Sequence, residues 1–443
     1  MWQGESAVFF TNLLSMFFGN EGQRRVLQQV ITYPESYGAR LLPIMGLLFP
    51  GGRNLAVLER GADSALCDYF KRGLGLDLPE IEVLTHDAYL ALGAEPLGAA
   101  AEEAVAVMER VKAHPSRVVD GFVTDALLER VAQRSGKRTL STPAGSQRGN
   151  NKLLLHHHLE SMGLPVFETL IAEGPADLPR CLRELGDRGF ECAVVKSQIG
   201  ASGVGLAKVG TTRPDAVIIG DLFFHEGPCL VQGWMKPGHH GVLEMLSPSV
   251  QLFLDENSVQ LYDMTEQILS DESVHEGNEA PPPYLERFEG LAEEMNRQAG
   301  IAGKWLHEQG YRGTASVDFV VARMEGGDPP RVYVCEINAR LTGATYPSLL
   351  ARHFVPHGGW LMRNLKLAEP TTGLTLLKLL DAHGHLFEPG RGEGILPFNF
   401  NLNPEDLVEK GQFLCLGATA ARCHEMLTHA EHDLPIDWDY VRD

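Results

Sequence analysis

Short apolar runs alternate with amphipathic stretches in the first part of the chain. Residues 6–11, 54–59 and 80–84 have the apolar and β-branched pattern of strands, and residues 24–29 and 64–72 have helical patterns. Such an alternation of strands and helices predicts a small α/β layer. The layer contains no G-x-G-x-x-G sequence, so the pattern does not predict a dinucleotide site.

The rest of the chain is richer in strands, and several follow one another without a helix between them. Helices are predicted at residues 99–113, 120–135, 152–162, 284–309, 348–368 and 375–383. Strands are predicted on both sides of a glycine-rich loop within residues 192–209, at 228–235, 242–246, 250–254, 259–262 and 394–400, and a last strand and helix within 411–429. This order predicts an α+β region after the α/β layer.

The strongest chemical signal lies in residues 311–347. Two β-branched apolar runs, at residues 314–322 and 332–337, flank the sequence GGDPP, which cannot continue a strand, so a β-hairpin is predicted. If the turn centres near Gly327, residues whose numbers sum to about 654 lie opposite one another. Asp318 then faces Glu336, and Asn338 lies on the same face of its strand as Glu336.

Two directly opposed carboxylates repel each other unless a cation lies between them. Carboxylate and amide oxygens are ligands that Mg²⁺ accepts, together with water and phosphate oxygens. We therefore expect Asp318, Glu336 and Asn338 to hold Mg²⁺. The alternative is a solvated hairpin whose acids point outward. The apolar arms and the nearby Arg340 favour the metal site.

Two lysines are candidates for phosphate binding. Asn151 can cap a helix that begins at Lys152, where a positive charge opposes the helix dipole unless it faces an anion. Lys196 lies in a strand before the loop GASGVG, whose glycines allow backbone N–H groups to close over phosphate oxygens. The loop lacks the Walker A pattern and the helix that follows it. A surface lysine and a plain glycine hairpin remain the alternatives.

Composition and charge limit the classes of partner. The chain has 443 residues, of which 44% are hydrophobic and 22% charged, and this predicts a globular protein of several domains. Its formal net charge of −20 argues against nucleic acid or an anionic membrane as a partner. No apolar run approaches the roughly 18 residues of a membrane span.

Cysteine usage indicates the compartment. The seven cysteines include no CxxC pair or other zinc spacing, and the N-terminus is a poor match to a signal peptide. We therefore expect reduced thiols in a cytoplasmic protein.

Four features occur in a fixed order along the chain. They are Lys152 at a helix start, Lys196 before a glycine loop, an apolar strand ending in QGWM, and the hairpin with its acids and Arg340. This set resembles the ATP-grasp superfamily over about residues 120–355. The sequences VVKSQIGASGVG, SPSVQLFL, TEQIL, EINARLTGATYP and GEGILPFNF most resemble the pheganomycin-type peptide ligases, which join a nonproteinogenic amino acid to the amine of a peptide.

The resemblance implies an α/β and α+β architecture, with a Rossmann-like pre-ATP-grasp domain followed by a two-subdomain ATP-grasp fold. The expected boundaries are 1–119 for the pre-ATP-grasp domain and 120–230 and 231–385 for the two ATP-grasp subdomains. A strand–helix extension at 386–443 is expected to pack on the ligase core.

The resemblance also implies residue roles. The ATP set comprises Lys152 and Lys196 on the phosphates, the flap residues Gly200, Ala201, Ser202, Gly203 and Gly205, and Gln232, Gly233, Trp234 and Met235 around adenine. Asp318, Glu336 and Asn338 would hold Mg²⁺, and Arg340 would stabilise the transferred phosphoryl group or the substrate carboxylate.

Two further residues complete the set. Many relatives carry Glu where this chain has Gln232-Gly233, so Glu244 is a candidate for the ribose contact. Arg312, before the hairpin, is a hypothesised second carboxylate clamp, with a surface arginine as the alternative.

The implied activity is ADP-forming carboxylate–amine ligation in peptide natural-product (antibiotic) biosynthesis, with ATP and Mg²⁺ as cofactors. The donor would be an amino acid or another small carboxylate, and the acceptor the amine of an amino acid or peptide. A small-molecule kinase on the same scaffold and a nucleotide-binding regulatory protein are the alternatives, and a homodimer is left open.

Overall fold

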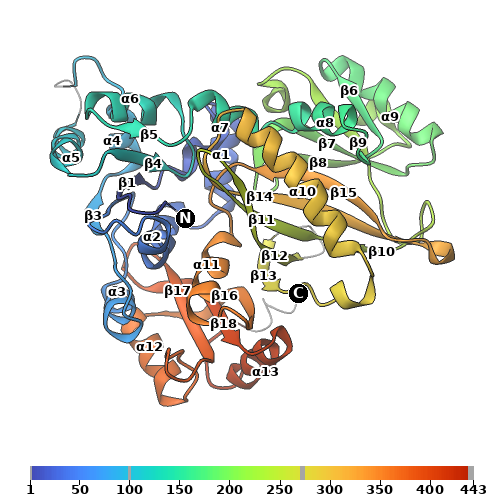
Figure 1. The fold of residues 1–443 in the computed structure, drawn as a ribbon. Helices are drawn as coiled ribbons and strands as arrows, with labels where there is room; N and C mark the ends of the chain where they lie inside the picture. The colour runs from blue at the N-terminus through green and yellow to red at the C-terminus, as the bar shows by residue number, and fades with distance from the viewer. Residues whose placement is uncertain (1, 98–100, 270–274, 438–443) are drawn as a thin grey trace.

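Three sheets form the protein (Figure 1). The computed structural model describes residues 2–97, 101–269 and 275–437, and all counts of elements refer to these residues. A five-stranded parallel sheet is followed by a four-stranded and a nine-stranded sheet, in both of which the pairings between strands are antiparallel. The predicted α/β layer and the α+β region after it are therefore confirmed. No described helix is long and apolar enough to cross a membrane.

The parallel sheet has the strand order β3-β2-β1-β4-β5. Its strands are β1 (Ala7–Phe10), β2 (Leu55–Leu58), β3 (Glu80–Val83), β4 (Val118–Gly121) and β5 (Arg138–Thr139). The helices of this region are α1 (Glu21–Val30), α2 (Leu42–Leu48), α3 (Ser64–Asp68), α4 (His86–Ala91), α5 (Glu102–Ala113) and α6 (Ala126–Arg134). The chain adds β2 and β3 on one side of β1 and then β4 and β5 on the other. The strand order therefore reverses between β1 and β4.

The predicted helix at 120–135 is wrong at its start. Asp120 and Gly121 end strand β4, and α6 begins after Asp125, whose side chain accepts a hydrogen bond from the N–H of Leu128. Pairing of β4 with the buried β1 decides the conformation of this segment, which local pattern alone misassigns. The sheet also continues to Thr139, past the expected boundary at residue 119. The helix predicted from residue 99 begins at Glu102, and residues 98–100 lie outside the described part of the chain.

The four-stranded sheet has the order β6-β9-β7-β8. It contains β6 (Thr169–Ala172), β7 (Cys192–Ala201), β8 (Val204–Gly210) and β9 (Cys229–Gly233), with α7 (Pro143–Gly149), α8 (Lys152–Ser161) and α9 (Leu178–Asp187) in the same region. Gln232 and Gly233 belong to β9, so the expected boundary between residues 230 and 231 falls inside a strand.

The nine-stranded sheet has the order β10-β14-β11-β12-β13-β16-β18-β17, and β15 pairs with β14 beside this path. Its strands are β10 (Val242–Leu246), β11 (Pro248–Leu254), β12 (Val259–Leu269), β13 (His275–Ala280), β14 (Gly313–Met324), β15 (Arg331–Asn338), β16 (Gly359–Thr371), β17 (Gly394–Leu402) and β18 (Val408–Gly417). The helices are α10 (Leu291–Glu308), α11 (Thr345–Phe354), α12 (Gly373–Ala382) and α13 (Ala420–Ala430).

The two faces of this sheet differ in polarity. Val250, Leu252 and Leu254 of β11 are buried in the same hydrophobic cluster as residues of α10, which crosses one face in Figure 1. Because side chains alternate along a strand, Ser249 and Gln251 point to the opposite face. Ser249 pairs with Asp318 there, so the polar residues of the hairpin and of β11 share one face.

The predicted helix at 348–368 is wrong in its second half. Helix α11 ends at Phe354, and β16 follows as a central strand between β13 and β18. Strands β17 and β18 continue the same sheet, so this part of the expected strand–helix extension belongs to the nine-stranded sheet itself. The amphipathic pattern of residues 359–368 fits a helix as well as a strand, and pairing with two neighbours decides it.

Candidate active site between the two antiparallel sheets

The hairpin has the predicted register. Strands β14 and β15 are antiparallel, and Asp318 lies directly opposite Glu336. Asn338 Nδ2 donates hydrogen bonds to Asp318 Oδ2 at 2.8 Å and to Glu336 Oε1 at 3.3 Å. The hydroxyl groups of Ser249 and Ser316 donate to Asp318 Oδ1 at 2.6 Å and 3.0 Å. Two carboxylates and one amide therefore converge on a single point of the sheet.

The charges around this point are unequal. Burial, and after it the negative charge of Glu336, raises the pKa of Asp318. Burial would also raise the pKa of Glu336, but the positive charges of Lys152, Arg340 and Lys196 outweigh it and lower this pKa. Glu336 is thus ionised beside an acid that resists ionisation. A divalent cation next to both would favour the ionised form of Asp318 as well.

The three side chains fit Mg²⁺ by their chemistry. No group of three His, Cys, Asp or Glu side chains that could hold a metal occurs in residues 2–97, 101–269 or 275–437. The hairpin instead offers two carboxylates and one amide. An ion held there would take hard oxygen ligands, which is the type that Mg²⁺ accepts. Asn338 now presents its Nδ2 to both carboxylates, and turning the amide over would present Oδ1 to the same place.

Lys152 connects three parts of the site. It is the first residue of α8, and the side chain of Asn151 caps that helix by accepting from the N–H of Leu154 at 3.0 Å. Its Nζ lies 3.0 Å from Glu336 Oε2 and donates to the carbonyl of Gly200 at 3.3 Å. The helix start, the glycine loop and the hairpin are therefore joined through one ammonium group.

A pocket lies between the two antiparallel sheets, next to Lys152. It is lined by Lys152, Leu155, His156 and Leu159 of α8, Val166, Phe167, Lys196 of β7, Leu230 and Gln232 of β9, and Val334 and Cys335 of β15. Lys196 Nζ lies 5.7 Å from the centroid of the Phe167 ring and 3.8 Å from Cys335 Sγ. Phe167 in turn stacks on Tyr333, with 5.0 Å between centroids. Apolar and aromatic walls with two lysines suit a flat base that carries phosphates.

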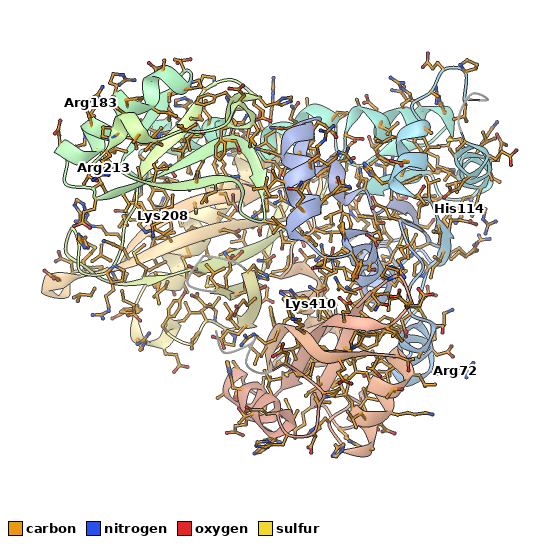
Figure 2. The ribbon with its side chains drawn as sticks, turned by 180° about the vertical axis from the view of Figure 1, so that it is seen from behind. Arg72, His114, Arg183, Lys208, Arg213 and Lys410 are labelled. Carbon is orange, nitrogen blue, oxygen red and sulfur yellow. The ribbon has the colours of Figure 1, made fainter. Side chains whose placement is uncertain are left out.

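The strand segment expected near adenine is partly engaged by the protein itself. Gln232 Nε2 donates to Thr169 Oγ1 at 3.0 Å. The N–H groups of Gly233 and Trp234 donate to the carbonyls of Glu168 and Cys192. The ammonium group of Lys208, a residue labelled in Figure 2, lies over the indole of Trp234, 4.5 Å from the ring centroid. Met235 packs against a small cluster that includes Tyr333.

The glycine loop is a tight turn between β7 and β8. Ser202 and Gly203 have φ values of +52° and +78°, which explains the small residues at this turn. Gln23 of α1 reaches under the loop, and its Nε2 donates to Ser197 Oγ at 2.8 Å and to the carbonyl of Ile199 at 3.0 Å. The N-terminal region thus holds the base of the loop.

Arg340 lies within the site. Its guanidinium donates to the side-chain oxygen of Asn150, which also accepts from the N–H of Ala339 at 3.2 Å. Burial lowers the pKa of Arg340, and the negative charges of Glu336 and Asp318 oppose this shift. The position of this arginine at the end of the hairpin is therefore compatible with the role expected for it.

Arg312 and Glu244 lie elsewhere. Arg312 donates to the carbonyls of His307 and Tyr311 at 2.9 Å and 2.7 Å, and it lines a different pocket. Glu244 on β10 pairs with Arg323 Nε at 2.9 Å and does not line the pocket that holds Lys196. The structure therefore brings neither residue to the lysines or to the hairpin acids.

Several polar residues that organise the site were not predicted from the sequence. Gln251 Nε2 donates to Ser249 Oγ at 2.8 Å, and Thr342 Oγ1 donates to Gln251 Oε1 at 3.2 Å. This chain of hydrogen bonds joins Asp318 to the turn after β15. The signal was present in SPSVQLFL, where Ser249 and Gln251 alternate with apolar residues of a fully buried strand.

Comparisons with known proteins bear on the fold of the chain. No family model matches the chain. The chain is 27% identical over 233 residues to the [butirosin acyl-carrier protein]–L-glutamate ligase of Niallia circulans, and the match spans about half of each protein, 52% of both.

Solved structures resemble the protein over most of its length. An N5-carboxyaminoimidazole synthetase from Staphylococcus aureus complexed with ADP has a TM-score of 0.53, 14% identity and 97% coverage of both chains. A biotin carboxylase–βγ-ATP complex from Campylobacter jejuni has a TM-score of 0.60 and 11% identity, covering 98% of this chain and 92% of that one. At these identities the likenesses show the fold, so the protein has the fold of the ATP-grasp enzymes that it resembles.

Proposed function

We propose that the protein is an ATP-dependent ligase that joins the carboxylate of an amino acid to the amine of an amino acid or peptide and releases ADP and phosphate. One observation carries the proposal. Asp318 and Glu336 face each other beside Asn338, and Lys152 bridges Glu336 and the glycine loop. A bound nucleoside triphosphate requires three kinds of group: acids that hold a divalent cation, a lysine, and a glycine loop.

The roles follow from these positions. Lys152 and Lys196 would contact phosphate oxygens, and the loop from Gly200 to Gly205 would close over them through its backbone N–H groups. Asp318, Glu336 and Asn338 would hold Mg²⁺, which when bound neutralises phosphate charge as the phosphoryl group is transferred. Closure of the loop would keep water from the reactive intermediate.

The chemistry of amide formation sets the order of steps. A carboxylate is a poor electrophile, so one of its oxygens first attacks the γ-phosphorus of ATP and ADP leaves. The amine nitrogen then attacks the carbonyl carbon of the acyl phosphate, loses a proton, and phosphate leaves with the bonding electron pair. Arg340 would neutralise charge that develops on the transferred group, because positioning and charge neutralisation dominate phosphoryl transfer.

The substrate class is supported by sequence similarity. The curated relative is named as a glutamate ligase that acts on an acyl-carrier protein, and this supports an amino acid as one substrate. The resemblance to pheganomycin-type ligases supports a peptide product and a place in natural-product biosynthesis. Arg312 keeps the proposed role of a carboxylate clamp only if a substrate displaces its contacts to two backbone carbonyls.

A screen tests the proposal. The protein is supplied with Mg²⁺, ATP and pools of amino acids and peptides, ADP release is measured, and products are identified by mass spectrometry. We expect ADP release that requires both a carboxylate and an amine, and a product lighter than the sum of its substrates by one water. Phosphorylation of an alcohol without an amine would identify a kinase, and ATP binding without turnover a regulatory protein.

Two variants make the screen specific. Glu336→Gln should lower the rate of ADP formation by at least about 100-fold, because it removes a charged ligand from the phosphoryl-transfer site. Glu325→Gln is the matched control, since Glu325 is exposed in the turn of the same hairpin. Equal turnover by the two variants would refute the metal assignment.

A further inference from the structure

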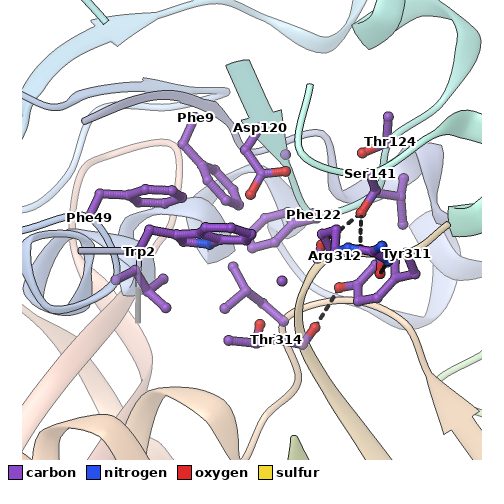
Figure 3. Close-up of a pocket in the computed structure, with 15 residues that line it drawn as sticks. Trp2, Phe9, Phe49, Asp120, Phe122, Thr124, Ser141, Tyr311, Arg312 and Thr314 are labelled. Atoms are coloured by element: carbon purple, nitrogen blue, oxygen red, sulfur yellow. Dashed lines mark hydrogen bonds between the residues drawn. The ribbon is translucent and has the colours of Figure 1, made fainter. Parts of the chain in front are cut away.

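A second pocket lies where the parallel sheet meets the nine-stranded sheet (Figure 3). Four aromatic rings surround part of it, those of Trp2, Phe9, Phe49 and Phe122, and the carboxylate of Asp120 points toward the cavity. We call this cavity the Asp120 pocket. The roles proposed above for nucleotide and metal binding use none of these five residues.

The pocket occupies a favourable place in the fold. Asp120 lies near the carboxyl end of β4, paired with Phe9 of β1, at the point where the order of the parallel strands reverses. Open α/β sheets bind ligands in the crevice outside the carboxyl ends of their strands at such a switch point. The two strands that meet at this point therefore provide a carboxylate and an aromatic ring to one cavity.

The opposite wall comes from the sheet that carries the hairpin acids. Thr314 of β14 lines the pocket, and Trp2 packs against Phe253 of β11, with 5.2 Å between ring centroids. Thr314 and Asp318 are four residues apart on one strand and so share a face, about 13 Å apart at the rise of an extended strand. The pocket and the hairpin acids therefore lie along the same face of β14.

Asp120 has no positively charged partner in the described residues. No Lys, Arg or His nitrogen of residues 2–97, 101–269 or 275–437 lies within 4.0 Å of its carboxylate. Burial raises the pKa of Asp120 to about 7, opposed by a hydrogen bond from the backbone of Gly121. Arg312 lines the same pocket, but its guanidinium donates to two backbone carbonyls. A shielded carboxylate of this kind is costly for stability, which is typical of a group that serves a ligand.

We propose that the Asp120 pocket binds a positively charged group, an ammonium or a guanidinium, of one of the ligase substrates. Aromatic faces attract cations, and the carboxylate supplies the opposite charge in a site shielded from water. The inference rests on the proposed function, because it describes a substrate of that ligase. The inference adds that one of the substrates carries a positive charge away from its reacting group.

The bound cation is a group that does not react. The attacking amine must lose its proton and reach the acyl phosphate beside the hairpin acids, about 13 Å along β14 from the pocket by the rise of an extended strand. The group in the pocket is therefore separated from the reacting atom by several bonds. The side chain of a basic amino acid and the amino terminus of a peptide both meet this requirement.

Binding of matched pairs of small molecules tests the proposal without requiring turnover. Calorimetry with the full chain, Mg²⁺ and a non-hydrolysable ATP analogue compares arginine with citrulline, lysine with norleucine, and triglycine with N-acetyl-triglycine. Members of a pair differ mainly in the positive charge. We expect the wild-type protein to bind the charged member of at least one pair tenfold or more tightly. Equal binding within all three pairs would overturn the proposal.

Variants locate the effect. Asp120→Asn, which keeps the shape of the side chain, should abolish the preference for the charged member. Asp77→Asn, the same change at an exposed position of the same region, should retain it. Phe122→Leu should weaken charged ligands severalfold, which provides a second measurement if Asp120→Asn folds poorly. A preference that survives in Asp120→Asn would refute the role of this residue.

The test separates this inference from the ligase proposal. ADP release is measured with the same small molecules and the same batches of protein, with ATP in place of the non-hydrolysable analogue. Binding with a charge preference but without ADP release would refute the ligase proposal and support the cation site. ADP release without a charge preference would support the ligase proposal and refute the cation site.

Discussion

The ammonium group of Lys152 lies 3.0 Å from the carboxylate of Glu336, although one residue begins helix α8 and the other lies on β15. The same ammonium group donates to the carbonyl of Gly200 in the glycine loop. The ammonium group lies between the acidic hairpin and the glycine loop. When nucleotide and metal bind, it can exchange its contact with Glu336 for a contact with a phosphate oxygen. Lys152 therefore joins the hairpin to the glycine loop in the ligand-free protein.

Replacing Lys152 by Met should weaken nucleotide binding. The change removes one charge-assisted hydrogen bond, worth about 1.5–3 kcal/mol, which corresponds to an affinity loss of about 10-fold to 150-fold. Titration calorimetry with a non-hydrolysable ATP analogue and Mg²⁺ measures the loss. Lys112→Met, at an exposed position of α5, should bind normally. Unchanged affinity in Lys152→Met would remove this lysine from the site.

Asp318→Asn should separate metal-dependent stability from intrinsic stability. Asp318 is half-buried opposite a like charge, so its replacement should not lower the melting temperature of the ligand-free protein. It should abolish the rise in melting temperature that Mg²⁺ and ATP together give the wild type. Thermal melts with and without both ligands test this, with Asp328→Asn in the exposed hairpin turn as the control. An undiminished ligand-induced rise would contradict the assignment of Asp318.

Gln23→Ala should loosen the glycine loop from the N-terminal region. Gln23 is fully buried, and its removal leaves the carbonyl of Ile199 and the hydroxyl of Ser197 without this donor, at a cost of about 1–3 kcal/mol. We expect a raised KM for ATP and faster proteolytic cleavage near residues 200–205. Gln133→Ala, at an exposed position of α6, should change neither. A wild-type cleavage rate in Gln23→Ala would show that this contact does not restrain the loop.

The raised pKa of Asp120 predicts a pH-dependent difference in stability. The pKa is about 7 in the folded protein against the ordinary value of 3.8, so the folded state binds more protons than the unfolded state between these values. The contribution of Asp120 to the free energy of unfolding therefore falls as the pH rises from about 4 to about 7. Asp120→Asn lacks this titration, and its melting temperature should gain on that of the wild type across this window. If the melting temperatures of the two proteins differed by the same amount at every pH in this window, the result would count against the raised pKa.

The hairpin shows how far local pattern carries. A turn signal between two β-branched runs predicted that Asp318 faces Glu336, because antiparallel pairing around a known turn leaves one register. Lys152 was also placed correctly at a helix start, since Asn151 is a strong cap. Residue order along the chain could not show that Lys152 reaches Glu336, because that contact joins elements 184 positions apart.

The errors have a common physical cause. Residues 359–368 were predicted to be helical, and Asp120 was assigned to a helix, yet both lie in strands whose partners are distant in the chain. Strand propensity depends on what lies on either side, and the sequence of one segment does not contain its neighbours. The place of Gln23 beneath the glycine loop was missed for the same reason.

The sequence by itself determined the alternation of strands and helices in the first region, the register of the acidic hairpin and the identities of the charged residues, because turns, caps and periodicity act over a few residues. Only the tertiary structure decided which of those charges meet, that the last strands complete the nine-stranded sheet, and that Asp120 faces an aromatic cavity. These outcomes depend on packing between segments far apart in the chain, where the entropy of bringing them together is offset only by the sheet as a whole.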